Sequence, residues 1–367
     1  MNDQEIWKKK RSRYIGCLLG GAVGDALGYP VEFLYEAQIC KRFGEEGIQT
    51  LEQAGNPARV SVDTQMTLFA ANALICTESN RESFEENIRI AYCEWLGTQG
   101  DFCGMEDADH FKMWIYRESR LHNLRAPGNT CLNAIRGYAE DKSLHFAKNN
   151  SKGCGTVMRA APFGLSVHYD PAVSKKDGAQ AVCSKAKYDA MLTHGHPAAH
   201  AASIALALII YEIVQCCSSE QNSLQEIITK ISTGQPEVDD LLKKAVSLAQ
   251  DVSVPDLIAI HTLGEGWIAE EALAIAVYCA VRYQDDFAEA IRAAVNHKGD
   301  SDSTGAICGN ILGAWLGREA VEEAFDINKL ELTDVIVSIA DDLYRSMEQG
   351  VPQPGTEAGW DEKYRRS

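Results

Sequence analysis

The sequence lacks the cysteine patterns that mark a structural zinc site or a disulfide framework. Its 12 cysteines include no pair at the spacing CxxC, and two of them, Cys216 and Cys217, are adjacent. Most of the others lie in apolar segments with helical periodicity, where a thiol packs as a small hydrophobic side chain. We therefore expect free thiols in a reducing compartment and no structural zinc.

Positive charge is also scarce. The chain has 35 Lys and Arg against 52 Asp and Glu, which gives a net charge of −17. A nucleic-acid backbone requires clustered cations, so we expect no nucleic-acid partner. The one basic cluster, residues 8–13, lies beside the N-terminus and is interpreted as a solvated helix start or a partner contact.

No apolar signal segment opens the chain, because the first ten residues, MNDQEIWKKK, are rich in charge. The longest apolar run, 198–214, is interrupted by His200, Ser203 and Glu212. Such a run is typical of a core helix, since a membrane span needs about 20 predominantly apolar residues. We expect a cytoplasmic protein with no membrane partner.

Alternating strand patterns, internal repeats and Pro- or Ser-rich linkers are absent as well, whereas apolar residues recur at helical spacing in almost every segment. This predicts an all-α fold with a single compact many-helix domain over residues 11–349. Residues 1–10 are predicted to be an N-terminal extension and 350–367 a loosely ordered tail. The predicted helices span 11–27, 64–77, 82–97, 109–120, 130–138, 156–168, 177–193, 198–218, 223–233, 237–251, 267–282, 287–296, 304–316 and 330–349.

The chain does contain an acidic turn in front of a glycine-rich helix. Asp300 and Asp302 lie in this turn among hydroxyl side chains, and four glycines then repeat every four residues (Ser301, Ser303 and Thr304; Gly305, Gly309, Gly313 and Gly317). Each glycine in a helix interior costs about 1 kcal/mol relative to alanine, so the repeat indicates close approach of another helix. Carboxylate and hydroxyl oxygens suit Mg²⁺ or Mn²⁺. Taken alone, the turn is better explained as an acidic cap on a buried helix.

Two further segments offer carboxylates close to a helix end. Glu32 ends GGAVGDALGYPVE, just past the end of the first predicted helix, where its side chain can enter a cleft or remain a surface glutamate. Ser61, Asp63 and Thr64 cluster in SVDTQM at the start of the next predicted helix. An Asp or Ser at a helix N-terminus is common as a cap, so neither segment identifies a site by itself.

Three more segments offer groups for an anion or a flat ligand. SKGCGTVMR places a Gly-x-Gly turn before a helix, where backbone N–H groups can bind phosphate, although it is neither GxGxxG after a strand nor a Walker loop. THGHPAAH holds three histidines; we interpret His194 as a phosphate or ribose contact and His200 as structural. Trp267 follows a Gly-rich turn, with core packing as the alternative.

In this order, GCLLGGAVGDALGYPVE, SVDTQMTL, SKGCGTVMRAAPFGL, THGHPAAHAA, GEGWIAEEALAIAVY and HKGDSDSTGAICGNILGAWLG resemble the ADP-ribosylglycohydrolase family, particularly its bacterial dinitrogenase-reductase-activating type. The resemblance spans residues 11–317. It implies an all-α domain whose central cleft holds two Mg²⁺ or Mn²⁺ ions. It also implies a hydrolase that removes ADP-ribose from modified protein side chains, in the first place from arginine.

The resemblance also assigns roles to residues of this sequence. It implies catalytic roles for Glu32, Asp63 and Asp302. The implied metal ligands are Ser61, Asp63, Asp300, Asp302 and Ser303. The implied ADP-ribose contacts are Gly153, Cys154, Gly155, Thr156, Met158, Arg159, His194, Trp267 and Ser301, with Arg159 either reinforcing the diphosphate contact or orienting its loop.

One position departs from the family pattern: Val62 stands where an aspartate ligand is usual. A valine cannot bind a hard cation, so one metal site is expected to be weakened. This leaves a second hypothesis, a catalytically weakened protein that binds ADP-ribose or neutralises an ADP-ribosyltransferase toxin by contact. An all-α prenyl-diphosphate enzyme is disfavoured because the sequence contains no DDxxD motif.

Overall fold

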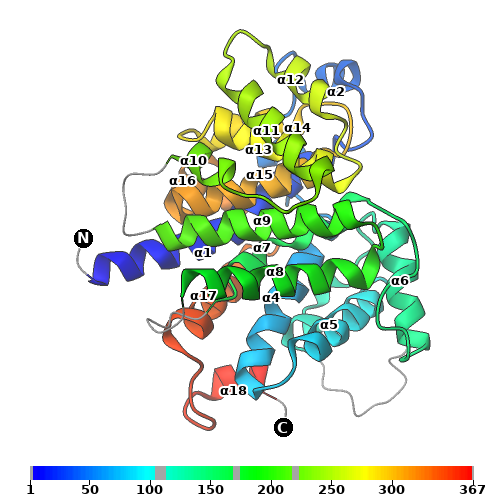
Figure 1. The fold of residues 1–367 in the computed structure, drawn as a ribbon, viewed down its shortest axis with the longest axis vertical. Coiled ribbons are helices and arrows are strands. Elements are labelled where there is room, and N and C mark those ends of the chain that lie inside the picture. Colours follow the sequence, from blue (N-terminus) through cyan, green and yellow to red (C-terminus); the bar gives the residue numbers. More distant parts are fainter. Residues whose placement is uncertain (1–2, 104–112, 168–173, 217–222, 366–367) are drawn as a thin grey trace.

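The computed structural model describes residues 3–103, 113–167, 174–216 and 223–365 (Figure 1). Within these ranges the regular structure is helical, with only two isolated β-bridges and no strand, so the predicted all-α class is confirmed. The α-helices are α1 (Asp3–Gly28), α2 (Glu36–Phe43), α3 (Leu51–Ala54), α4 (Val62–Asn80), α5 (Phe84–Thr98), α6 (Asn129–Glu140), α7 (Ala161–Gly164), α8 (Lys175–Thr193), α9 (Pro197–Gln215), α10 (Leu224–Thr229), α11 (Pro236–Gln250), α12 (Asp256–Leu263), α13 (Ala269–Arg282), α14 (Phe287–Val295), α15 (Ser301–Leu316), α16 (Arg318–Ala324), α17 (Thr333–Tyr344) and α18 (Ala358–Tyr364).

Most predicted helices agree with the structure to within a few residues, and two predictions need correction. The segment 109–120 was expected to be one helix; its described part forms two 3₁₀ turns, Trp114–Arg117 and Ser119–Leu121, and the rest lies outside the described residues. The segment 156–168 is divided into a 3₁₀ helix, Cys154–Arg159, and the short α7, because Pro162 fits only the first turn of a helix. Residue 168 lies outside the described ranges.

Helices α1 and α15 lie side by side and antiparallel at the centre of the molecule (Figure 1). Glycines of the two helices face one another in the pairs Gly16–Gly313, Gly20–Gly309 and Gly24–Gly305. A Cβ at Gly309 would overlap the carbonyl oxygen of Gly20, and a Cβ at Gly20 would overlap that of Gly309. The backbones therefore touch directly, which explains the four-residue repeat.

This glycine ladder is accompanied by one polar contact. The side chain of Asn310 is 2% exposed and donates a hydrogen bond to the carbonyl oxygen of Cys17 at 2.8 Å. A Cβ at Gly21 would overlap the Asn310 amide, so this residue too requires a glycine opposite it. Because the helices are antiparallel, the C-terminal end of α1 lies beside the N-terminal end of α15, with Gly28 next to Ser301.

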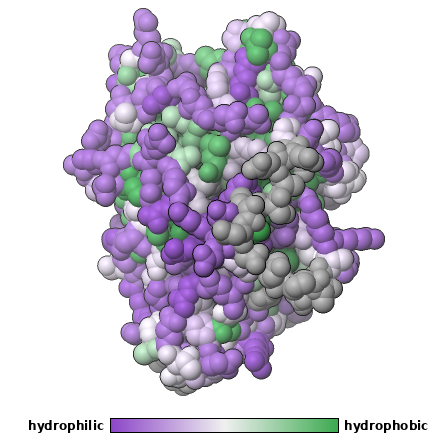
Figure 2. Space-filling view, turned by 90° about the vertical axis from the view of Figure 1, so that its left-hand side faces the viewer, coloured by the Kyte–Doolittle hydropathy of each residue, from purple (hydrophilic) through white to green (hydrophobic). Residues whose placement is uncertain are grey.

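Helix α9 is long and apolar enough to cross a membrane by length and composition, but 72% of its most apolar window is buried inside the fold. It packs against α7, α8 and α15, as the predicted core helix requires. The face drawn in Figure 2 is mostly hydrophilic, with apolar side chains in small separate groups.

Both chain ends are more ordered than predicted. The segment assigned to an N-terminal extension is the first part of α1, and Lys10 forms an ion pair with Glu348 at 2.9 Å. The segment assigned to a loose tail contains α18. Its Trp360 is 2% exposed and donates to the hydroxyl of Ser79 at 3.1 Å. Tyr364 of the same helix is fully buried and donates its hydroxyl to Asp342 at 2.8 Å, so two aromatic residues anchor this short helix.

Candidate metal-binding active site

The acidic turn packs against the glycine-rich segment that contains Glu265, and its two aspartate side chains are buried. Asp300 donates its backbone N–H to the carbonyl oxygen of Glu265 at 2.8 Å. A Cβ at Gly299, where φ is +128°, would overlap the same oxygen. Both Asp300 and Asp302 are 3% exposed. Helix α15 begins at Ser301, three residues before its predicted start, so Asp302 lies in the first helical turn.

The start of α4 faces this turn. Ser61 is the N-cap of α4, and its hydroxyl accepts the N–H of Asp63 at 3.2 Å. The Asp63 carboxylate, 2% exposed, accepts a hydrogen bond from the Ser303 hydroxyl at 2.8 Å. Residues 240 positions apart in the chain thus meet directly, as the prediction of a shared site requires.

Asp25, which the sequence reasoning missed, supports this meeting point from α1. It is fully buried, and its carboxylate accepts the N–H of Ser61 at 2.9 Å, the N–H of Thr64 at 3.1 Å and the Thr64 hydroxyl at 2.5 Å. These groups form the N-terminus of α4, where a negative charge is stabilised. A lone aspartate within an apolar glycine-rich helix was the available signal, because such a group stays buried only when it is paired.

Glu32 completes the cluster from the turn that follows α1. Glu32, Asp300 and Asp302 each present a carboxylate oxygen, and these oxygens lie within 4.8 Å of one another. Burial, followed by the charges of Asp302, Asp63 and Asp25, raises the pKa of Glu32 to about 9. Glu32 is half-buried, and of its two predicted locations it has the one beside the other carboxylates rather than a free position on the surface.

All five carboxylates have raised pKa values, and burial is the largest cause in each: Asp25, Glu32, Asp63, Asp300 and Asp302. In all of them except Asp302, the charges of neighbouring carboxylates raise the pKa further. The pKa of Asp25 is raised to about 7. No Lys or Arg is among the main causes of these pKa shifts. A buried cluster of this kind needs cations, and its oxygen donors fit Mg²⁺ or Mn²⁺. The four predicted acidic residues are suited to hold such ions, with the hydroxyls of Ser61 and Ser303 beside them.

Val62 occupies the first turn of α4 between two of these residues. Its side chain is 5% exposed and belongs to the hydrophobic core, and its N–H donates to the carbonyl oxygen of Arg125 at 3.0 Å. It adds no oxygen to the acidic cluster, as expected from its chemistry.

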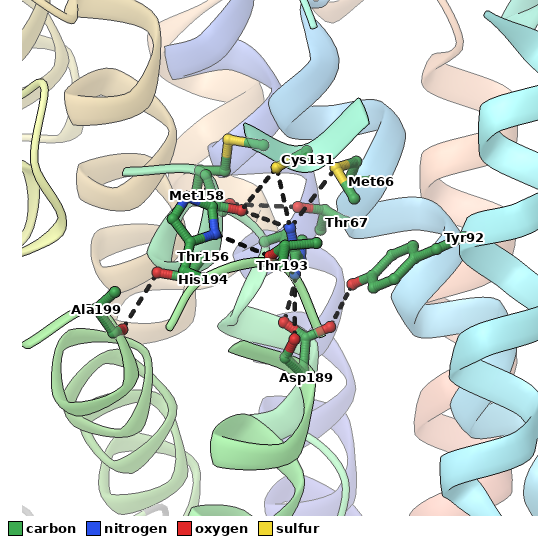
Figure 3. A network of polar contacts seen from close by, with 12 residues as sticks. Met66, Thr67, Tyr92, Cys131, Thr156, Met158, Asp189, Thr193, His194 and Ala199 are labelled. Atoms are coloured by element: carbon green, nitrogen blue, oxygen red, sulfur yellow. Dashed lines mark hydrogen bonds and ion pairs between the residues drawn. The ribbon is translucent and has the colours of Figure 1, made fainter. Parts of the chain in front are cut away.

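Arg159 anchors the glycine-rich loop from inside the protein. Figure 3 shows Tyr92, Asp189 and Thr193, which contact it, close to one another. It is fully buried and forms an ion pair with Asp189 at 3.0 Å. Its other nitrogens donate to the carbonyl oxygen of Gly155 at 2.6 Å and the hydroxyl of Thr193 at 2.9 Å, and the guanidinium lies 4.7 Å from the ring centre of Tyr92. All three nitrogens are used within the protein. Of the two predicted roles, the structure assigns Arg159 the orientation of the loop and not contact with a diphosphate.

The side chains of His194, Thr156 and Met158 are also buried on the inner side of the loop. The His194 ring is 1% exposed and shares a hydrogen bond with the Thr193 hydroxyl at 2.9 Å. Burial and then the nearby Arg159 lower its pKa to about 3, so the imidazole is neutral. Thr156 donates its hydroxyl to Ala199, and Met158 is 4% exposed. None of these three side chains is therefore exposed for the contact with ADP-ribose that was predicted for it.

Among the predicted ADP-ribose contacts in the loop, the partly exposed ones are Gly153, Cys154 and Gly155. The N–H of Cys154 donates to the carbonyl oxygen of Trp267 at 3.2 Å, so it is not free for an anion. Burial raises the pKa of the Cys154 thiol, and the carboxylates of Asp300 and Asp63 raise it further, which places the thiol beside the acidic cluster.

The remaining two predicted contacts differ in exposure. Trp267 is 37% exposed and stacks on Phe33, with ring centres 5.2 Å apart and planes inclined by 19°. It therefore lies at the rim of the site, not in the core. Ser301 is fully buried and donates its hydroxyl to the carbonyl oxygen of His297 at 3.0 Å, which makes it part of the helix start.

An all-α bundle with buried carboxylates at the junction of α1, α4 and α15 defines a class of helical proteins with an acidic, cation-binding centre. Residues 7–352 match the family model described as ADP-ribosylglycohydrolase, and the chain belongs to that family, whose members are glycosidases that release ADP-ribose. The resemblance noted in the sequence is thereby confirmed.

Individual relatives agree with this assignment. The chain is 24% identical to ADP-ribosyl-[dinitrogen reductase] glycohydrolase of Rhodospirillum rubrum over 87% of this chain and 90% of the relative. It is 24% identical to ADP-ribosylhydrolase ARH3 of Homo sapiens, over 89% of this chain and 92% of the relative. A solved structure titled ADP-ribosylglycohydrolase-related protein complex matches with a TM-score of 0.62 and 25% identity, covering 92% of this chain and 99% of that one.

The raised carboxylate pKa values predict an unusual pH dependence of stability. Folded Asp25 (pKa about 7) and Glu32 (pKa about 9) retain protons that the unfolded chain releases near pH 4. The free energy of unfolding of metal-free protein should therefore fall as the pH rises from about 5 to 9, by about 1.4 kcal/mol per pH unit for each retained proton. Urea unfolding in EDTA measures this slope. Saturating Mn²⁺ should raise the stability and flatten the slope, because bound cations keep the carboxylates ionised. A metal-free stability that is constant or rises over this range contradicts the interpretation.

Proposed function

We propose that the protein hydrolyses the N-glycosidic bond between ADP-ribose and an arginine side chain of a modified protein, with Mg²⁺ or Mn²⁺ as cofactor. The observation that carries this proposal is the convergence of Glu32, Asp63, Asp300 and Asp302 on one buried point beside a glycine-rich loop. The hydroxyl and carboxylate oxygens there suit a pair of divalent ions, with Val62 weakening one of the two positions.

Bound divalent ions would supply positive charge that binds ribose hydroxyls and lowers the pKa of a water molecule. The protein holds that charge with Asp63, Asp300 and Asp302 and keeps Glu32 beside it. In the proposed reaction the water oxygen forms a bond to the anomeric carbon while the carbon–nitrogen bond to the guanidine breaks. Glu32 accepts the proton of the water and returns it to the departing guanidine, which leaves as guanidinium.

The glycine-rich loop supports the rest of the substrate. The N–H of Gly155 lies at the start of the 3₁₀ helix, ahead of the first i→i+3 hydrogen bond, where a backbone donor lacks a helical partner and suits a diphosphate. Arg159 fixes the loop through the Gly155 carbonyl group. The exposed ring of Trp267 offers a flat apolar surface at the rim.

The decisive experiment measures release of ADP-ribose from ADP-ribosyl-arginine protein and, in parallel, from ADP-ribosyl-serine peptide, with Mg²⁺ or Mn²⁺ present. We expect metal-dependent release from the arginine linkage at the higher rate. Faster release from the serine linkage would contradict the arginine assignment. No release from either substrate, combined with tight ADP-ribose binding, would overturn the hydrolase proposal.

Val62 favours a second candidate, a protein that binds ADP-ribose or a transferase toxin with little turnover. The variant Val62→Asp separates the candidates, because an added carboxylate should tighten the weaker Mn²⁺ site by about tenfold or more. If the wild type is inactive and Val62→Asp hydrolyses the substrate, the missing ligand limits turnover and the binding function is favoured. If the wild type is active and Val62→Asp changes neither Mn²⁺ affinity nor rate, position 62 does not contribute to the site.

A further inference from the structure

In the described part of the chain the carboxylate of Glu32 makes no hydrogen bond, although its backbone N–H donates to the carbonyl oxygen of Gly28 at 3.0 Å. Within the described part of the chain, the groups that act on its carboxylate are the surrounding solvent-excluding atoms and three other carboxylates, and all of them disfavour its charge. Repulsion would drive the side chain out of the cluster unless the backbone were fixed. Backbone hydrogen bonds to Gly28 fix the start of this turn at the end of α1, so its far side must be anchored by other contacts.

The anchor lies at the next residue. Phe33 has a left-handed backbone conformation with φ of +67°, which is strained for a bulky residue. Its side chain is 66% exposed yet stacks on Trp267. Strain at an exposed aromatic residue persists only when its contacts maintain it, and this stack is the ring contact that Phe33 makes in the described structure.

Hydrogen bonds fix the segment that carries Trp267. Glu265 and Gly266 donate their N–H groups to the Glu271 carboxylate at 3.0 and 3.3 Å. The carbonyl oxygen of Glu265 accepts the N–H of Asp300, and that of Trp267 accepts the N–H of Cys154. The segment 265–267 is thus bound to the acidic turn through Glu265 and to the glycine-rich loop through Trp267.

The segment 33–36, called the strap below, is fixed a second time at its far end. The Glu36 carboxylate accepts the N–H of Lys298 at 2.9 Å and contacts the His261 ring at 2.7 Å, and Lys298 lies over the ring of Tyr35. Residues 33–36 are therefore bound to the segments that carry Trp267 and Asp300, and Glu32 lies between this strap and α1.

From this arrangement we infer that Phe33 is a positioning residue: its stack on Trp267 holds Glu32 at the metal-binding carboxylates. The inference rests on the proposed function, and it adds a residue that touches neither the ions nor the reacting atoms. Loss of the ring should release the turn and let Glu32 leave the cluster, while Asp63, Asp300 and Asp302 remain in place.

The test compares Phe33→Ala with Phe33→Gly, which also removes the ring but relieves the backbone strain, and with Phe33→Tyr, which keeps the ring. Isothermal titration of Mn²⁺ should show affinity reduced about tenfold in Phe33→Ala and Phe33→Gly and near that of the wild type in Phe33→Tyr. The turnover number should fall with the affinity, whereas KM for ADP-ribosyl-arginine should change little. Phe102→Ala, which removes an exposed phenylalanine after α5, is the matched control and should leave both quantities unchanged.

A double-mutant cycle distinguishes positioning from general structural damage. If Phe33 acts through Glu32, adding Phe33→Ala to Glu32→Gln should have no further effect on Mn²⁺ affinity. An equal loss in both backgrounds, or wild-type Mn²⁺ affinity in Phe33→Ala, would overturn the inference. Because Mn²⁺ titration needs no substrate, these outcomes are readable even if the protein proves to hydrolyse neither linkage.

Discussion

Asp302→Asn is expected to reduce kcat/KM for ADP-ribose release by about 1,000-fold, which corresponds to a loss of about 4 kcal/mol of transition-state stabilisation. Asp302 lies within 4.8 Å of both Glu32 and Asp300 and contributes to the raised pKa of Asp25, Glu32, Asp63 and Asp300. Its replacement removes the charge at the centre of the cluster. The asparagine oxygen can still accept the N–H of Ser303, now at 3.0 Å, so the fold should be retained.

The same variant should have the opposite effect on metal-free stability. Removing one of several buried like charges relieves repulsion, so unfolding in EDTA should require more urea than for the wild type. Mn²⁺ titration should show weakened binding. Asp240→Asn, on the exposed surface of α11, serves as the control for kinetics and unfolding. Wild-type kcat/KM in Asp302→Asn would remove this residue from the active site.

The second large effect is expected in the glycine ladder. Gly309→Ala places a methyl group on the carbonyl oxygen of Gly20, where backbone faces backbone and no side chain can move aside. We expect the free energy of unfolding to fall by about 3 kcal/mol or more, since overpacking against a rigid neighbour forces the helices apart. Chemical denaturation followed by circular dichroism measures the change.

Gly137→Ala provides a matched control within another helix. A Cβ there meets only a side-chain carbon of Leu144 at 3.9 Å, an ordinary contact. This variant should be stabilised by up to about 1 kcal/mol, because alanine is the better helix former. Similar destabilisation of both variants would indicate that helical glycines in general, and not the ladder, govern the effect.

The sequence was sufficient to predict features that depend on local pattern. Helical periodicity predicted the long helices, and the residues around Asp300 and Ser61 could be recognised as one site once the family resemblance joined them. Asp25 was missed because its hydrogen-bond donors lie 36 and 39 residues farther along the chain. A contact at that separation leaves no periodic signal.

Burial was the other property that local pattern could not supply. The depth of Arg159 depends on Asp189, 30 residues away, and on the Tyr92 ring from α5. A histidine or arginine beside a Gly-rich motif is chemically suited to phosphate, so His194 and Arg159 were natural predictions. Only the packing of α5, α8 and α9 around the loop shows that both support it from inside. The order in the tail likewise depends on the burial of Trp360 against Ser79, which is 281 residues away in the chain.

The glycine repeat between α1 and α15 cannot by itself define the register of the two helices, because each glycine pair, or rung of the ladder, is chemically the same as the next. A slip of one rung, four residues or about 6 Å along the helix axis, would again match glycine with glycine. It would also carry Glu32 away from Asp302 by about that distance, too far for the two to share a cation. Asn310 breaks the degeneracy, because only the native alignment gives its amide both the space at Gly21 and the Cys17 carbonyl oxygen. A single buried amide thus specifies the register of the two helices, much as a buried asparagine does in coiled coils. The ladder sets how closely the helices approach, and Asn310 sets which residues meet at their ends.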